Sequence, residues 1–263
     1  MLASRHMSDE GYELEYIHDA FQKNWIAPLG ENVNKFEKTM GEFMGEGYPV
    51  ALSAGTAALH LAMILAGVKT GDTVFCQSLT FSAGGGMLLC RTEDEAKHAL
   101  KLSTQARENA PWYQHEEIGY NYRMSNICAG IGRGQMKVLP LRVEQKRAIF
   151  ARYCENLKGL PLTMQPELPC AKSNRWLSVA LLDEGCGVTP GEMLAKLNEA
   201  GIEGRYLWKP MHLQPVFANC PFVSVSDAPV GDDLFARGVC LPSDTKMSMD
   251  DVDRVCEAIR GMF

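Results

Sequence analysis

The sequence lacks an apolar run long enough to cross a bilayer, and it has no internal repeat or low-complexity segment. It also lacks a CxxC pair, and its nine cysteines stand singly along the chain. That spacing favours reduced thiols over a disulfide framework or a zinc site. Positive charge is scarce as well, since the formal net charge is −6 and no Lys/Arg run alternates with aromatics. We therefore expect no membrane span, no metal centre and no nucleic-acid partner.

The start of the chain has no apolar segment either, and it carries acidic residues at Asp9, Glu10, Glu13 and Glu15. These features do not predict a signal sequence, so we expect a cytoplasmic protein. What the chain does have is an ordinary globular composition, with 46% hydrophobic and 22% charged residues among 263. This length permits one large domain or two modest ones.

The first part of the chain predicts helices alternating with short strands. Strands are expected at residues 48–52, 72–81 and 84–90. Helices are expected from Ser8 as a cap, from about Asn32, over 56–66, and from the Thr92/Glu95 capping box. Because the helix at 56–66 is apolar on nearly all sides, we expect both of its faces to be buried.

Beyond a polar, aromatic loop, Ser125 is expected to cap a helical region that reaches about Leu157. Pro140 interrupts this region and predicts a kink or two helices. The remainder predicts strands near 176–182, 201–208 and 238–242, and helices that start at Thr189-Pro190 and Ser248. We expect two domains, one over residues 1–157 and a small α+β domain over residues 158–263.

The strongest local signal for chemistry is the turn Gly55-Thr56-Ala57, between a predicted strand and a predicted helix. Free backbone N–H groups and the helix dipole at such a start suit an anion, and the Thr56 hydroxyl adds a donor. The spacing alone is equally satisfied if Gly55 only permits the turn and Thr56 only caps the helix.

Two other patterns give weaker evidence for a functional site. The string GIGRGQ (130–135) contains part of a dinucleotide fingerprint, but it lies inside a helical pattern with no preceding strand, so the Rossmann interpretation is rejected. Tyr113, His115 and Glu116 form a polar group in a loop. One histidine beside one glutamate lacks the ligand number and spacing of a metal site, and loop polarity explains them.

Several long segments, in order, resemble the DegT/StrS-type sugar aminotransferases. They include residues 6–37, ALSAGTAALHLAMILAGVKTGDTVFCQSLTFSA (51–83), YQHEEIGYNYRMSNICAGIGRGQM (113–136) and GRYLWKPMHLQPVF (204–217). The resemblance covers almost the whole chain. It implies an α/β fold, namely an incomplete fold-type-I aminotransferase large domain, a mixed sheet with helices, followed by the small α+β domain.

The resemblance also implies roles for individual residues. Gly55, Thr56 and Ala57 would hold the phosphate of pyridoxal 5'-phosphate, and Phe81 would stack on its ring. Asn121 matches an asparagine that reaches the phosphate from the neighbouring subunit of a homodimer. Arg123 is either structural or directed at the substrate, and His212 matches a position near the sugar. From the residues alone, Phe81 is a core side chain and His212 an ordinary loop histidine.

The resemblance further implies that a long segment is missing where Ala83 runs directly into Gly84. In the family this segment carries the aspartate that faces the pyridine nitrogen, a phosphate-binding serine and the Schiff-base lysine. The lysine is the covalent anchor and proton carrier of transamination, and the aspartate keeps the ring an electron sink. None of the chain's thirteen lysines is expected to replace it, because eleven, Lys146 among them, stand in polar, solvated contexts.

The resemblance therefore predicts an aminotransferase of nucleotide-sugar biosynthesis that is catalytically impaired. Its substrates would be a nucleotide-linked keto sugar and glutamate. The alternative is a non-catalytic remnant that keeps the family's dimer surface and binds a partner subunit. A deletion introduced in sequencing or assembly is a third possibility.

Overall fold

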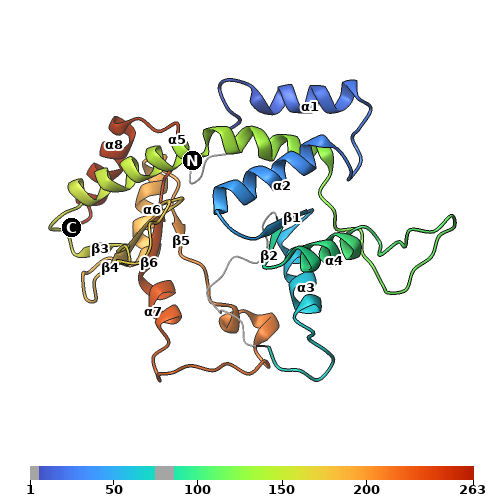
Figure 1. Ribbon diagram of the computed structural model, residues 1–263. Helices are drawn as coiled ribbons and strands as arrows, with labels where there is room; N and C mark the ends of the chain where they lie inside the picture. Colours follow the sequence, from blue (N-terminus) through green and yellow to red (C-terminus); the bar gives the residue numbers. More distant parts are fainter. Residues whose placement is uncertain (1–5, 75–85) are drawn as a thin grey trace. The chain divides into compact units, whose positions relative to one another are not determined.

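The computed structural model describes residues 6–74 and 86–263 (Figure 1). These residues form two compact units, one made of residues 7–74 and 86–138 and the other of His6 with residues 139–263. The division falls inside the long helix α5 (Asn126–Asn156), between Val138 and Leu139. The domain boundary expected after residue 157 stays a prediction.

The N-terminal unit is built around β1 (Tyr48–Leu52) and β2 (Gly86–Cys90), which pair antiparallel with Leu52 opposite Gly86. Side chains alternate along β1, so Val50 and Leu52 face one side of the pair and Ala51 faces the other. The strands expected at 48–52 and 84–90 are thus confirmed. The strand expected at 72–81 lies mostly outside the described residues.

Helices cover both sides of this strand pair. The side of Leu52 packs against α3 (Gly55–Leu65) and α4 (Glu93–Ser103), whereas the side of Ala51 packs against α2 (Glu31–Met44) and α5 (Figure 1). The capping box expected at the start of α4 is present, because Thr92 Oγ1 accepts from Glu95 N–H at 3.2 Å while the Glu95 carboxylate accepts from Thr92 N–H at 3.2 Å.

The expectation that α3 is buried on both faces is wrong for the described residues. Ala57 and Leu61 are buried against the strands, but the side chains of Leu59 and Met63 are 69% and 39% exposed. The described part of the sheet offers α3 one surface to pack on, and its opposite face stays in solvent. An apolar surface of this kind favours association with other surfaces.

Helix α1 (Tyr12–Gln22) begins three residues later than the sequence predicts, because Gly11 and not Ser8 is its N-cap. Ser8 still satisfies the first turn from outside the helix, since its Oγ accepts a hydrogen bond from Tyr12 N–H at 3.1 Å. The same hydroxyl donates to Glu13 Oε2 at 2.6 Å, and Glu13 is one of the two buried residues of α1. Ser8 therefore orders the start of α1 without being its cap.

Helix α5 runs without interruption through Pro140, so the alternative of two helices is wrong. Its start follows the prediction, because Ser125 Oγ accepts from Cys128 N–H at 3.2 Å. The GIGRGQ string lies wholly inside α5, as its helical pattern indicates. Its glycines serve packing: a Cβ on Gly132 would lie 2.8 Å from the Phe36 ring, and one on Gly134 would lie 2.7 Å from the backbone nitrogen of Glu13.

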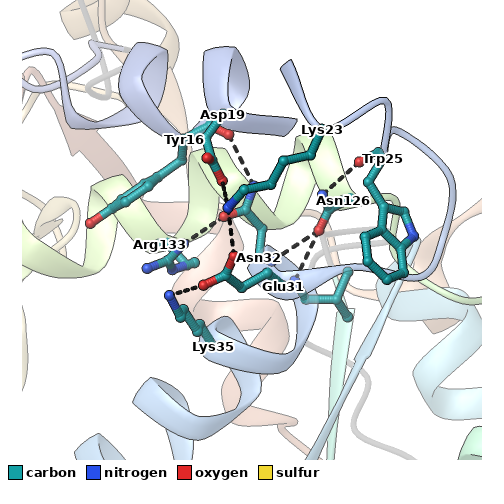
Figure 2. A network of polar contacts seen from close by, with 10 residues as sticks. Tyr16, Asp19, Lys23, Trp25, Glu31, Asn32, Lys35, Asn126 and Arg133 are labelled. Carbon is teal, nitrogen blue, oxygen red and sulfur yellow. Dashed lines mark hydrogen bonds and ion pairs between the residues drawn. The ribbon is translucent and has the colours of Figure 1, made fainter. Parts of the chain in front are cut away.

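The first residue of α5 caps a different helix. Helix α2 has Gly30 at its N-cap and no side chain of its own to cap it. Figure 2 shows the Asn126 carboxamide at this end of α2, where its Oδ1 accepts from Asn32 N–H at 3.0 Å and from Val33 N–H at 3.4 Å. Its Nδ2 donates to the carbonyl oxygen of Trp25 at 2.6 Å. Asn126 therefore joins α2, α5 and the chain between α1 and α2.

A second set of polar contacts continues this junction (Figure 2). The Asn32 side chain donates to the carbonyl oxygen of Tyr16 at 3.0 Å and accepts from Arg133 at 2.5 Å. The Arg133 guanidinium also lies 3.9 Å from the centre of the Tyr16 ring. Helix α1, whose outer face carries exposed Leu14 and Phe21, is therefore held largely by polar and cation–π contacts.

The C-terminal unit contains an antiparallel sheet in the order β3-β4-β6-β5. The strands are β3 (Leu162–Met164), β4 (Ser178–Leu182), β5 (Arg205–Tyr206) and β6 (Gly238–Leu241). One face, with Ala180 and Leu182, forms the largest core of the unit with α5, α6 (Pro190–Glu199) and α8 (Met249–Arg260). The small α+β arrangement expected from the sequence is observed here.

The helix starts expected in this unit are confirmed. Thr189 forms a capping box with Glu192 at the start of α6, and Ser248 forms one with Asp251 at the start of α8. The pattern missed β3 and α7 (Val230–Arg237), which are three and eight residues long. It also missed two short 3₁₀ helices, Met211–Leu213 and Pro215–Phe217.

Candidate functional site

The predicted phosphate-binding turn lies where β1 passes into α3. Ala54 is the extended N-cap of α3, and no side chain caps the first turn of the helix. Gly55 and Thr56 follow, with the Thr56 side chain exposed, while Ala57 is buried in the core beneath the turn. This arrangement leaves the start of α3 available to an anion, which fits the phosphate end of the cofactor.

Strand β2 packs closely on the same turn. A Cβ on Gly86 would lie 2.0 Å from the carbonyl oxygen of Ala54 and 2.8 Å from the nitrogen of Gly55. Only glycine fits at residue 86, because every other residue would collide with backbone atoms that cannot move independently of the turn. The GGGM string was predicted as a strand, and the structure gives its last glycine a specific packing role.

The segment around Asn121 runs alongside the end of β1. Ser53 N–H donates to the carbonyl oxygen of Tyr122 at 2.7 Å, and Met124 N–H donates to that of Ala51 at 3.2 Å. These two bonds bring residues 121–124, which are distant in sequence, to the end of β1 where α3 begins. The predicted residues Gly55, Thr56, Ala57 and Asn121 therefore lie in one region of the N-terminal unit.

Two tyrosines fix the orientation of this segment. The Tyr120 and Tyr122 rings are stacked, with centroids 5.0 Å apart, and Tyr122 Oη lies 3.2 Å from His60 Nδ1 on α3. Successive side chains of an extended segment point to opposite sides. Asn121 between them therefore points away from His60 and is exposed. His60, Tyr120 and Tyr122 were not predicted as site residues from the sequence, and the alternation of tyrosines in GYNYR was the signal that could have found the two tyrosines.

Arg123 is buried in an ion pair. Its guanidinium contacts both carboxylate oxygens of Glu37, one through Nη1 and the other through Nη2 at 3.1 Å. Glu37 also accepts from Ala51 N–H at 2.7 Å, so the pair connects α2, β1 and the segment of Asn121. This geometry favours the structural role among the two that the sequence leaves open. A contact of Arg123 with the substrate stays a prediction.

The loop before Asn121 is anchored to α4 by charged side chains. Lys101 Nζ lies 2.6 Å from Glu108 and 3.1 Å from Glu117, and Glu117 also contacts His98 at 2.8 Å. The contact with His98, and then that with Lys101, holds the pKa of Glu117 below its ordinary value. His115 contacts the carbonyl oxygen of Gln105 at 2.9 Å, a bond that helps to close this loop.

His212 lies in the C-terminal unit, in the 3₁₀ helix Met211–Leu213. Its Nε2 is 2.9 Å from Asp232 Oδ1 of α7, and its ring stacks on Phe222 with centroids 3.6 Å apart. Both contacts orient the imidazole. Phe81, the predicted ring-stacking residue, lies outside the described residues.

All thirteen lysines of the chain lie within the described residues, and seven of them belong to the N-terminal unit. Lys69 follows the C-terminal end of α3, opposite the turn at Gly55. Among the other lysines of the N-terminal unit, Lys23, Lys35, Lys38, Lys97 and Lys101 pair with carboxylates, and Lys137 lies over the Tyr12 ring.

The expectation that Lys146 is solvated is wrong. The sequence places it in a solvated context, but it is buried in the C-terminal unit and donates to the carbonyl oxygens of Trp176, at 3.1 Å, and Ser243. Burial lowers the pKa of its ammonium group. The sequence around Lys146 does not reveal this burial, because its partners Trp176 and Ser243 lie outside α5. Its amine is occupied by these carbonyls, so Lys146 offers no free amine, whereas the start of α3 fits the phosphate of the cofactor.

The same fold occurs in solved aminotransferases. TlmJ from Streptoalloteichus hindustanus superposes with a TM-score of 0.86 at 18% identity, covering 99% of this chain and 98% of that one. A DegT DnrJ EryC1 StrS aminotransferase from Brucella abortus gives 0.84 at 19% identity, covering 96% and 95%. The fold is thus that of the fold-type-I pyridoxal-phosphate aminotransferases, in an incomplete form.

The sequence comparisons narrow this class. The putative pyridoxal phosphate-dependent aminotransferase EpsN of Bacillus subtilis is 34% identical, with 100% of this chain and 95% of EpsN aligned. GDP-perosamine synthase of Vibrio cholerae is 21% identical, with 97% of each aligned. The profile of the DegT/DnrJ/EryC1/StrS aminotransferase family matches residues 8–84 and 82–260. The chain belongs to this family.

Two features of these matches concern the junction at Ala83 and Gly84. The alignment with EpsN is 373 positions long, although this chain has 263 residues. The family profile matches in two pieces that meet at residues 82–84. The two pieces of the profile meet at the junction where the sequence predicts a missing segment, and the missing segment itself stays a prediction.

Proposed function

We infer that this chain is a pyridoxal-phosphate-dependent aminotransferase of nucleotide-sugar biosynthesis whose present form does not transaminate. The inference that the present form does not transaminate rests on the environment of the lysines. Each lysine of the N-terminal unit is paired, stacked or placed beyond the far end of α3, and Lys146 is bound to two carbonyl oxygens. A transaminase needs one free amine at the cofactor.

The residues that remain would bind and orient. Gly55, Thr56 and Ala57 would hold the cofactor phosphate through the start of α3, and Asn121 would reach the phosphate bound by the partner in a homodimer. When bound, the cofactor supplies an electron sink for the amino-group carbon. Its ring would stack on Phe81.

The same proposal includes the substrates and their contacts. A nucleotide-linked keto sugar would be the acceptor and glutamate the amino donor. His212, oriented by Asp232 and Phe222, would face the sugar. Arg123 would act mainly by holding the Asn121 segment against Glu37. A cytoplasmic location is part of this proposal, because singly spaced thiols suit a reducing compartment.

The test compares two proteins. The chain as it stands and a repaired chain, with the missing segment of a close family member inserted between Ala83 and Gly84, are incubated with pyridoxal phosphate and reduced with borohydride. Peptide mass mapping should find a cofactor–lysine adduct at one site in the repaired chain and at no single lysine in the present chain. A specific adduct in the present chain would refute the impairment. A repaired dimer that binds the cofactor but aminates no keto sugar would refute the activity.

A second candidate, a non-catalytic partner subunit, is favoured by the orientation of Asn121, which points away from His60 on its own α3. A repaired chain carrying Asn121→Ala should form a dimer with a defective phosphate site. Mixing it with the present chain, which retains Asn121, should restore amination if the present chain pairs with complete subunits. No restoration, with mixed dimers demonstrated by native mass spectrometry, would exclude this role.

A further inference from the structure

A cavity lies between the polar side of α1 and helices α2 and α5. Its volume is about 360 Å³, and all of its lining residues belong to the N-terminal unit. Helices α2 and α5 pack on the Ala51 side of the strand pair, whereas α3 packs on the Leu52 side (Figure 1). The cavity therefore lies away from α3, whose start is the predicted phosphate site.

The charged side chains that line this cavity balance in number when His18 is neutral. They are three carboxylates and three cations, namely Glu15, Asp19, Glu31, Lys23, Lys35 and Arg133. Lys23 Nζ lies 2.9 Å from Asp19 and 2.8 Å from Glu31, and Lys35 also contacts Glu31 (Figure 2). The contact with Lys23, and then that with Lys35, lowers the pKa of Glu31 to about 2. Glu15 and Arg133 take no part in these pairs.

The guanidinium group of Arg133 is oriented by neutral groups. Its Nη1 donates to Asn32 Oδ1 at 2.5 Å, and the group lies 3.9 Å from the centre of the Tyr16 ring (Figure 2). Within residues 6–74 and 86–263, no carboxylate lies at ion-pair distance from it. A guanidinium carries five N–H groups in a planar fork that matches a carboxylate. Arg133 therefore presents to the cavity an oriented donor whose charge no carboxylate neutralises.

Glu15 supplies the opposite charge to the cavity. Its side chain is exposed beside Tyr16 and makes no hydrogen bond or ion pair with the part of the chain that the structure describes. Its field reaches Lys137, whose ammonium group lies over the rings of Tyr12 and Tyr16. An anion at Arg133 would be repelled by Glu15, and a cation at Glu15 would be repelled by Arg133. A ligand that carries both charges satisfies both side chains.

We propose that this cavity binds a free amino acid, with its carboxylate on Arg133 and its ammonium group on Glu15. A zwitterion matches a lining whose charges balance, whereas a phosphate dianion would meet no surplus of positive charge. The bound amino acid joins two helices, since Glu15 belongs to α1 and Arg133 to α5. Because α1 is otherwise held largely by polar and cation–π contacts, the ligand fastens it. The site is independent of the aminotransferase activity proposed above.

The test is a titration of the full chain, labelled with nitrogen-15 and followed by NMR. Glycine, β-alanine and γ-aminobutyrate, whose charged groups are separated by one, two and three carbon atoms, are added separately. At least one should shift the Arg133 Nε–H signal and the amide signals of α1 to saturation. Propionate and ethylamine, which carry one charge each, should bind at least about fivefold more weakly. Absence of a saturable shift with all three amino acids would overturn the proposal, and so would equal binding of propionate.

Substitutions assign each charge of the ligand to a side chain. Glu15→Gln should weaken binding of the amino acid about fivefold and strengthen binding of propionate, because the repulsion of its carboxylate is gone. Arg133→Lys keeps a cation but loses the fork, so it should weaken the amino acid about threefold. Glu46→Gln, at an exposed carboxylate that does not line the cavity, is the control and should change neither affinity. Equal weakening of the amino acid and propionate by Glu15→Gln would refute the ammonium contact.

Hydrogen exchange provides a second measurement. Because the ligand joins α1 to α5, a saturating amino acid should slow amide exchange in α1. Exchange in α3, which packs on the other side of the strand pair, should stay unchanged and serves as the internal reference. Saturable binding that leaves the exchange of α1 unchanged would place the ligand outside this cavity and refute the proposal.

Discussion

Asn126, the first residue of α5, accepts a hydrogen bond at 3.0 Å from the backbone N–H of Asn32, 94 residues earlier in the chain. The carboxamide does for α2 what a local Ser or Asp does for most helices, because Gly30 at the N-cap has no side chain. Asn126→Ala should therefore remove a cap and leave a buried N–H and the Trp25 carbonyl unpaired. We expect a loss of about 2 kcal/mol in the free energy of unfolding, measured with urea.

The matched control is Asn34→Ala, an exposed asparagine on α2 itself. It should change the stability by no more than about 0.5 kcal/mol. Equal effects of the two substitutions would mean that Asn126 is not the cap of α2.

Arg123 and Glu37 provide a second prediction. Removing one partner of a buried ion pair leaves an uncompensated charge, which costs about 3 kcal/mol. Arg123→Met should therefore destabilise the chain strongly, and Arg123→Met with Glu37→Met should recover part of the loss. Arg91→Met, an exposed arginine before α4, serves as the control. A stable, well-folded Arg123→Met variant would return Arg123 to the substrate-binding candidates.

Two helical glycines should respond in opposite directions. A Cβ at Gly134 of α5 would lie 2.7 Å from the backbone nitrogen of Glu13, whereas a Cβ at Gly41 of α2 would meet Pro49 only at 3.5 Å. Gly41→Ala should raise the stability by about 0.5–1 kcal/mol, since alanine is the better helix former. Gly134→Ala should lower it, because the collision outweighs that gain. A rise in both melting temperatures would mean that α1 does not pack tightly on α5.

The pH dependence of stability should reveal that Lys146 is buried in the folded chain. Burial lowers its folded-state pKa, so in the alkaline range below 10.5 the unfolded chain binds more protons than the folded chain. The contribution of Lys146 to the free energy of unfolding is therefore most favourable above the pKa that Lys146 has in the unfolded chain. This contribution is lost as the pH falls through the pKa that Lys146 has in the folded chain. As the pH rises from 8 to 10.5, the free energy of unfolding of the wild type should increase relative to that of Lys146→Met.

Lys196→Met is the control for this measurement, because Lys196 is an exposed lysine on the surface of α6. A difference between wild type and Lys146→Met that is independent of pH would show that Lys146 is solvated when the chain is folded.

The sequence predicts elements whose signals are local. The caps at Thr92, Thr189 and Ser248 were predictable because the donor and acceptor of a capping box are three residues apart. The cap of α2 was not predictable in this way, because its acceptor, Asn126, is far away in the chain. Ser8 was misplaced for a related reason: its hydroxyl binds the first turn of α1 from outside the helix.

The candidate site shows the same limit. The turn at Gly55 was evident from a strand, a glycine and a helix in succession, and the resemblance to the family located Asn121 and His212. Their neighbours depend on tertiary contacts that no spacing reveals. Glu37 reaches Arg123 across 86 residues.

Helix α5 has a consequence for anyone who tries to separate the two units. They share this helix without an intervening loop, and the division falls between Val138 and Leu139, next to Pro140. A protease that cuts loops finds no linker there, and an expression boundary placed at residue 157 leaves one unit without Ile149 and Tyr153, which belong to its core. Pro140 cannot donate the backbone hydrogen bond that an interior helical residue gives to the fourth residue before it. Helix α5 therefore lacks a backbone hydrogen bond next to the division between the units. A cut at Pro140 would leave each unit with the part of α5 that packs on it.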